Sequence, residues 1–171
     1  MASKPAFDSL IDEYSREIFA YLWRLFQGRD AAEDCFQETF LRAFKAYPRV
    51  RASANLRAWL YKIASNAAFT NMKKEKRLSE RGVQLTNAHP SSEPSVAEQV
   101  SDRLLISEIG EAIRSLPAKQ QAALLMRKYQ GLSYAEIGRA LESSPAAARA
   151  NAYQALRKLR VQFAPLDDPR R

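Results

Sequence analysis

Apolar residues recur at intervals of three and four in two long stretches of this chain, residues 7 to 77 and residues 101 to 163. This spacing is typical of one buried face of an α-helix, whereas a half-buried strand alternates strictly between apolar and polar residues. The 171 residues contain no such alternation and no internal repeat. The pattern therefore predicts an all-α protein.

The helical spacing stops between the two stretches. Residues 78 to 100 lose it and collect Ser, Pro, Gly and Asn, and a joint of this length is long for a loop inside one compact domain. We therefore expect two small helical domains, residues 1–77 and 101–171, joined by a flexible linker, residues 78–100. The net charge is also uneven along the chain, at +5, −3 and +6 over residues 1–77, 78–110 and 111–171. An acidic connector between two basic units could let them fold back on one another.

The basic excess indicates the class of partner. A net charge of +8 favours an anionic partner such as nucleic acid or a membrane surface. The apolar runs are too short for a membrane span, so we expect no membrane insertion. Cys35 is the single cysteine and the chain opens with no secretion signal, which favours the cytoplasm.

The sequence offers little for catalysis. Its one histidine, His89, lies in the predicted linker away from Cys35, so no nucleophile is paired with a base and no zinc ligand set is present. The five glycines form no phosphate-binding loop. We expect no enzyme activity, no metal and no cofactor.

Three helices are expected in the first domain. The first runs from Phe7 to a stop at Gly28, the second from Asp30 to Ala46, and the third from Leu56 to about Lys76. Asp30 is a candidate cap for the second. The predicted buried residues are Ala32, Phe36, Phe40 and Phe44 on the second helix and Leu56, Trp59, Leu60, Ile63 and Ala67 on the third, with Tyr61 expected to be more exposed.

Two helix starts lie close together in the second domain. Ser133 and Glu136 form an S-x-x-E capping box, and Ser144 followed by Pro145 is a second start signal just after Leu141. A turn this tight predicts a helix-turn-helix, whose second helix can enter a major groove. A plain pair of helices with a solvated basic face remains an alternative.

The second of these helices offers few base-reading groups. Its predicted buried face holds Ala148, Ala152, Leu156, Leu159 and Phe163, and its outward positions are Ala146, Ala147, Ala150, Gln154 and Arg157, with Arg149, Asn151, Tyr153 and Lys158 at the flanks. Alanine can contact a thymine methyl group but cannot hydrogen-bond a base. We expect Arg149 to contribute affinity for all sequences and Gln154 to select one base.

Three segments resemble bacterial RNA polymerase sigma factors of the extracytoplasmic-function (ECF) group. LPAKQQAALLMRKYQGLSYAEIGRAL, residues 116–141, is similar to their C-terminal helix-turn-helix domain. DAAEDCFQETFLRAF, residues 30–44, and LRAWLYKIASNAA, residues 56–68, are similar to their region-two helices. The resemblance implies a transcription initiation factor that binds core RNA polymerase, directs it to promoter DNA and aids strand opening, sometimes under the control of an anti-sigma factor.

The resemblance also implies site residues. Core polymerase contacts would fall on Asp34, Gln37, Glu38 and Leu41. The downstream promoter element and the melted strand would meet Arg49, Arg51, Asn55, Arg57 and Asn66, with Lys62, Lys73, Lys74, Lys76 and Arg77 on phosphates. The upstream element would be recognised by Ser133, Tyr134, Ala146, Ala147, Arg149, Ala150, Asn151, Tyr153, Gln154 and Arg157.

The chain departs from the family pattern at several of these places. The family often has Arg where this chain has Ser65, Asp where it has Thr70, and Gly where it has Glu142, and Arg149 alone keeps a charge along the recognition helix. Two other hypotheses therefore stay open. The chain could be a stand-alone helix-turn-helix regulator that never touches polymerase, or a helical scaffold whose basic charge serves solubility.

Overall fold

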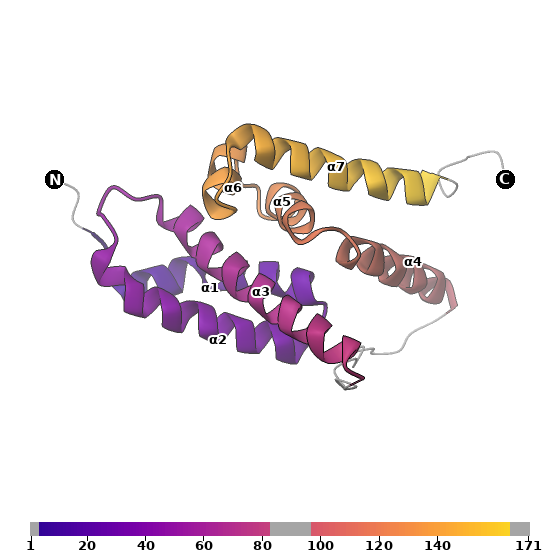
Figure 1. The fold of residues 1–171 in the computed structure, drawn as a ribbon, viewed down its shortest axis with the longest axis horizontal. Helices are drawn as coiled ribbons and strands as arrows, with labels where there is room; N and C mark the ends of the chain where they lie inside the picture. The colour runs from indigo at the N-terminus through magenta and orange to yellow at the C-terminus, as the bar shows by residue number, and fades with distance from the viewer. Residues whose placement is uncertain (1–3, 83–96, 165–171) are drawn as a thin grey trace.

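The computed structural model describes residues 4–82 and 97–164, and only the backbone for residues 97–102 (Figure 1). The helices are α1 (Phe7–Phe26), α2 (Arg29–Ala46), the 3₁₀ turn η1 (Tyr47–Arg49), α3 (Leu56–Glu80), α4 (Ala97–Arg114), α5 (Ala118–Lys128), α6 (Tyr134–Ala140) and α7 (Pro145–Phe163). No strand occurs within the described ranges, which confirms the all-α class. None of the described helices has the length and apolar character needed to cross a membrane.

Helices α1, α2 and α3 pack on one another as the first helical unit. Helix α1 ends at Phe26, before Gly28, because Gln27 takes the left-handed conformation with φ of 51°. Helix α2 begins at Arg29 with Gly28 as its cap, so the predicted capping role of Asp30 is wrong. Helix α3 continues to Glu80 and α4 starts at Ala97, so both extend into the segment predicted as linker. The remaining linker positions, residues 83–96, lie outside the described residues.

The buried face of α2 differs from the prediction. Its buried side chains are Ala32, Cys35, Thr39 and Ala43. Phe36 and Phe40 are half-buried at the edge of that face, and Phe44 is 61% exposed. Small residues line the contact because they let α2 approach α1 and α3 closely, while the large rings extend around its rim.

Tyr61 also differs from the prediction, because it is fully buried. Its ring lies against that of Tyr21 at 5.2 Å between centroids, in an edge-to-face arrangement. Leu60 and Ala67 are buried as predicted, whereas Leu56, Trp59 and Ile63 are only half-buried. The core of this unit therefore contains Tyr61, which was expected to be more exposed.

The second unit consists of α4 to α7, with α7 packed across α5 and α6. Both predicted helix starts are confirmed: Ser133 and Glu136 form the reciprocal capping box of α6, and the Ser144 side chain caps α7. The buried residues of α7 are Ala148, Ala152 and Ala155. Ala155 was missed, and the predicted Leu156, Leu159 and Phe163 are half-buried.

The two units lie against each other. Helix α3 packs on α6, and α1 packs on α5 and α4, so that the apolar core continues from one unit into the other (Figure 1). Buried Gln121 of α5 donates from Nε2 to the Leu25 carbonyl at 3.2 Å, and Gln27 donates to the Gly110 carbonyl at 2.6 Å. The units are thus folded back on one another in this structure.

Candidate nucleic-acid interface

Gly138 lets α6 approach the turn that leads into α7. A Cβ at Gly138 would lie 2.8 Å from the carbonyl oxygen of Ser143, whose own N–H donates to the Gly138 carbonyl at 2.8 Å. The Ser144 hydroxyl then accepts from the Ala147 N–H at 3.0 Å, and Pro145 takes the first helical position. This compact turn makes α6 and α7 a helix-turn-helix and leaves one face of α7 outward.

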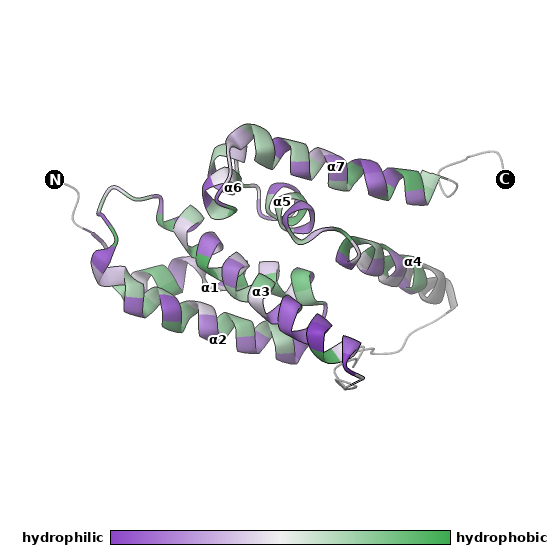
Figure 2. Cartoon of the chain, in the orientation of Figure 1, coloured by the Kyte–Doolittle hydropathy of each residue, from purple (hydrophilic) through white to green (hydrophobic). Residues whose placement is uncertain are grey.

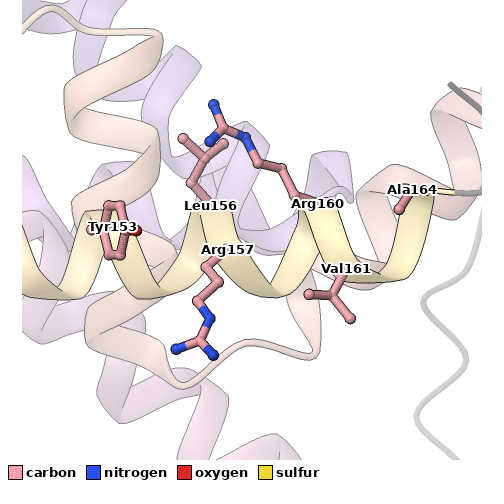
Figure 3. A pocket seen from close by; sticks show the side chains of 6 residues that line it. All are labelled: Tyr153, Leu156, Arg157, Arg160, Val161 and Ala164. Atoms are coloured by element: carbon pink, nitrogen blue, oxygen red, sulfur yellow. The ribbon is translucent and has the colours of Figure 1, made fainter.

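The outward face of α7 carries the residues predicted for upstream recognition. Exposed positions are Ala146, Arg149, Ala150, Tyr153, Gln154 and Arg157, while Ala147 and Asn151 are half-buried. Figure 3 shows Arg157 on one side of α7 and Leu156 with Arg160 on the other, so cations flank the helix on both sides. Helix α7 packs on α4, α5 and α6, which places its outward face away from α1 to α3 (Figure 1).

The start of α6 is more constrained than its exposure suggests. The Ser133 N–H donates to a Glu136 carboxylate oxygen at 2.9 Å, and the Ser133 hydroxyl lies 3.0 Å from the same oxygen. The Ser133 N–H, followed by its hydroxyl, holds the pKa of Glu136 below its ordinary value. Tyr134 lies under the guanidinium of Arg127, 4.7 Å from the ring centroid. Both predicted residues are therefore engaged within the second unit.

Three predicted strand-contacting residues of α3 and its cap also contact other parts of the chain. Arg57 forms a two-point ion pair with Glu17, at 3.0 and 2.7 Å, and donates to the Gln130 carbonyl at 2.6 Å. The Glu17 hydrogen bonds raise the pKa of Arg57, which stays charged. Asn55 caps α3 by accepting from Ala58 N–H at 2.9 Å and reaches Glu136 at 3.4 Å, and Lys62 pairs with Glu142 at 2.8 Å.

Glu142 occupies the position where the family pattern has Gly. Its φ of 52° lies in the left-handed region, which favours glycine. The carboxylate instead reaches across to Lys62 of α3, and the hydrogen bond to Lys62 lowers the pKa of Glu142. This departure therefore adds a contact between the two units.

The other predicted cations remain open to solvent. Arg49, Arg51, Lys73, Lys74, Lys76 and Arg77 are exposed, and none of these cations takes part in an ion pair within the described residues. Figure 2 shows the last turns of α3 as strongly hydrophilic. The result is an uncovered basic track along the end of α3 and on the loop before it.

Lys4 was missed by the sequence analysis and anchors that loop. Its ammonium group donates to the carbonyls of Tyr47 and Val50, the latter at 3.1 Å, and lies 4.0 Å from the Tyr47 ring centroid. The Tyr47 hydroxyl donates to the Pro5 carbonyl at 2.6 Å. A lone lysine near the start of a chain carries no local signal for such a contact.

The departure at Ser65 has a structural reason, whereas nothing in the structure explains the one at Thr70. Ser65 is fully buried and its hydroxyl lies 2.9 Å from that of Tyr21, so the side chain of an arginine would not fit there. Thr70 is exposed, and its hydroxyl donates to the Asn66 carbonyl at 2.9 Å. Asn66 is exposed on the same surface of α3.

The predicted polymerase-binding residues lie together on the outer side of α2. Asp34 and Gln37 are exposed, Glu38 pairs with Arg42, and Leu41 is 55% exposed. Phe44, expected in the core, stands on this surface and meets the Phe7 ring at 5.3 Å. Carboxylates and large apolar groups therefore share one surface, which we call the α2 face: Asp34, Gln37, Glu38, Leu41 and Phe44.

The described residues hold no group of His, Cys, Asp and Glu side chains suited to a metal ion. His89 lies outside the described residues. The second unit is thus a helix-turn-helix unit, and the first unit, which packs against it, carries its own basic track.

Comparison with known proteins identifies the family. Residues 10–78 match the model for Sigma-70 region 2, and residues 106–159 match the model for Sigma-70, region 4. The chain is 33% identical over 159 residues to the ECF RNA polymerase sigma factor BldN of Streptomyces coelicolor, covering 90% of this chain and 59% of BldN. It is 28% identical to the RNA polymerase sigma factor CarQ of Myxococcus xanthus, covering 96% of this chain and 93% of CarQ. The chain belongs to the sigma-70 family, in its ECF group.

The fold is also that of solved sigma factors. The sigma factor RpoE of Bartonella quintana, in a complex with the anti-sigma factor NepR, superimposes with a TM-score of 0.71 at 21% identity. The alignment covers 94% of this chain and 98% of that one. The likeness extends over both helical units.

Proposed function

We propose that this chain is a transcription initiation factor that binds core RNA polymerase, directs it to promoters and aids strand opening. The observation that carries the proposal is the pairing, in one chain, of a region-2 unit and a region-4 helix-turn-helix. In this proposal the polymerase catalyses RNA synthesis, and this chain recognises the promoter. The cytoplasm is the compartment in which such a partner resides.

The α2 face is the proposed contact with core polymerase. Leu41 and Phe44 are 55% and 61% exposed, and large apolar side chains held in this way are common anchors of protein interfaces. The nearby carboxylates of Asp34 and Glu38 suit a basic partner surface. The α2 face therefore combines an apolar centre, Leu41 and Phe44, with an acidic rim, Asp34 and Glu38.

Promoter capture requires the two units to separate at α3. In this structure Arg57 donates to the Gln130 carbonyl, Lys62 pairs with Glu142 and Asn55 donates to Glu136, all in the second unit. A melted strand would take over these donors, while the exposed lysines at the end of α3 contact its phosphates from the outset. The upstream-reading face of α7 needs no such release, since it points away from the first unit.

An anti-sigma protein is a further partner within this proposal. Two structural neighbours are described as complexes of this kind, RpoE with NepR and CnrH with the cytosolic domain of CnrY. Such a regulator would cover exposed apolar groups, and α4 offers Leu104 and Ile106 at 60% and 68% exposure.

The test is binding to purified core polymerase followed by transcription from genomic DNA. The double variant Leu41→Ala/Phe44→Ala should bind core about tenfold or more weakly. Ile106→Ala is the matched control, because it removes an equally exposed apolar side chain from the second unit. Equal binding by wild type and double variant would refute the α2 face. Stable operator binding without any affinity for core would favour the stand-alone regulator.

A further inference from the structure

A glutamine pair links α5 to the outward face of α7. Gln120, in the first turn of α5, donates from Nε2 to Oε1 of Gln154 at 2.8 Å. Gln154 is exposed on the proposed DNA-reading face, whereas Gln120 is half-buried beneath it. The family resemblance assigns Gln154 a role but gives none to Gln120.

The hydrogen bond from Gln120 determines the orientation of the Gln154 side-chain amide. A glutamine side chain has an accepting end and a donating end, and adenine readout uses both of them. Here Oε1 already accepts from Gln120, while Nε2 keeps both of its hydrogens for DNA. The end that faces the groove is then the donor end.

The reverse polarity is disfavoured by the surroundings of Gln120. Its Oε1 is enclosed and has no hydrogen-bond partner among the described residues. If both amides turned over, the Gln120 NH₂ group would occupy that enclosed site in place of the carbonyl oxygen. A buried N–H is harder to leave without a partner than a carbonyl oxygen, which favours the observed orientation.

We propose that Gln120 is a positioning residue that fixes which end of the Gln154 amide faces the major groove, and so selects guanine at one upstream promoter position. Guanine presents two acceptors, O6 and N7, at its major-groove edge, which matches an outward NH₂ group. This inference rests on the proposed function, since it requires α7 to read the upstream element.

The experiment uses holoenzyme, formed from core polymerase and the full chain, on a promoter library with all four bases at each upstream position. Wild type should prefer guanine at one position by about tenfold, and Gln154→Ala should lose that preference. Gln120→Ala should reduce the preference severalfold while leaving the other positions unchanged, because the amide can then turn over. Gln162→Ala is the control, since it removes another exposed amide from α7.

Gln120→Glu gives the sharpest outcome. Its carboxylate only accepts, so Gln154 must turn Nε2 toward it and present Oε1 to DNA. The preferred base at that position should change from guanine to one with an exposed amino group, adenine or cytosine. Unchanged preference in both Gln120 variants, or an equal loss of affinity for all four bases, would overturn the positioning role.

The variants distinguish failure of the Gln120 positioning role from failure of base reading by Gln154. If Gln154→Ala alters a base preference and the Gln120 variants do not, only the positioning role is wrong. If Gln154→Ala alters no position, Gln154 does not read a base and the positioning role has no basis, whereas the proposed function stands or falls with core binding and transcription.

Discussion

Substitution of one glycine tests how the helix-turn-helix is built. In Gly138→Ala the new Cβ would lie 2.8 Å from the Ser143 carbonyl oxygen and 3.1 Å from Pro145 N. These are backbone atoms, which cannot rotate away, so the turn must move by several tenths of an ångström. Forcing a methyl group into packed surroundings costs about 1–3 kcal/mol.

The higher helix propensity of alanine opposes this steric cost, and the relative size of the two decides whether Gly138→Ala is less stable than wild type. Alanine is favoured over glycine in a helix by about 1 kcal/mol. With a clash against backbone on two sides, we expect the cost to sit near the upper end of its range and the net loss to be about 1–2 kcal/mol. That is a sizeable share of the roughly 5–15 kcal/mol by which folded domains are stable.

Gly110→Ala is the matched control for this measurement. Gly110 is also helical, in α4, but the nearest atoms to its Cβ would be the end of the Gln27 side chain, which can move aside. Because this movement gives up the exposed hydrogen bond from Gln27 to the Gly110 carbonyl, the loss offsets the helix gain of about 1 kcal/mol and we expect stability close to that of wild type. Urea unfolding of both variants measures the difference, and upstream-promoter binding should weaken in Gly138→Ala alone. A Gly138→Ala variant as stable as Gly110→Ala would refute the close-packed turn.

Three further outcomes follow from buried and capping groups. Tyr21→Phe should cost about 1–2 kcal/mol in thermal unfolding because it breaks a buried hydrogen bond, whereas Tyr61→Phe should be neutral because the Tyr61 hydroxyl has no partner in the described structure. Burial raises the pKa of the Cys35 thiol to about 12, so a thiol reagent at pH 8 should react only with unfolded chain; rapid labelling of native protein would contradict this. The lowered pKa of Glu136 stabilises the folded chain above pH 4.5, and this stability is lost as pH falls below that value. In Glu136→Gln the acid unfolding curve should be flatter there, and an unchanged curve would count against the cap.

Local signals in the sequence predicted the parts of the fold that depend on neighbours along the chain. The capping box at Ser133 and the second cap at Ser144 are contacts within three residues, and both were found. The buried face of α2 was predicted correctly at Ala32 but wrongly at the phenylalanines, because apolar spacing alone favours large residues. Close helix packing instead selected small ones such as Ala43 and placed Phe44 outside.

Contacts between the units could not be predicted in this way. Gln121 bonds to the Leu25 carbonyl and Lys62 pairs with Glu142, and each joins residues far apart in the sequence. No pattern within a helix encodes such a partner. The same holds for Gln120 and Gln154, since the positioning of a reader depends on which helix lies beneath it.

The most direct test of the central claim is to sequence the 5′ ends of RNA made from genomic DNA by core polymerase with and without this chain. We expect starts that appear only with the chain and that share an upstream and a downstream sequence element at a fixed spacing. If the chain binds core yet adds no new starts, or if the new starts share no such pair of elements, the account is contradicted.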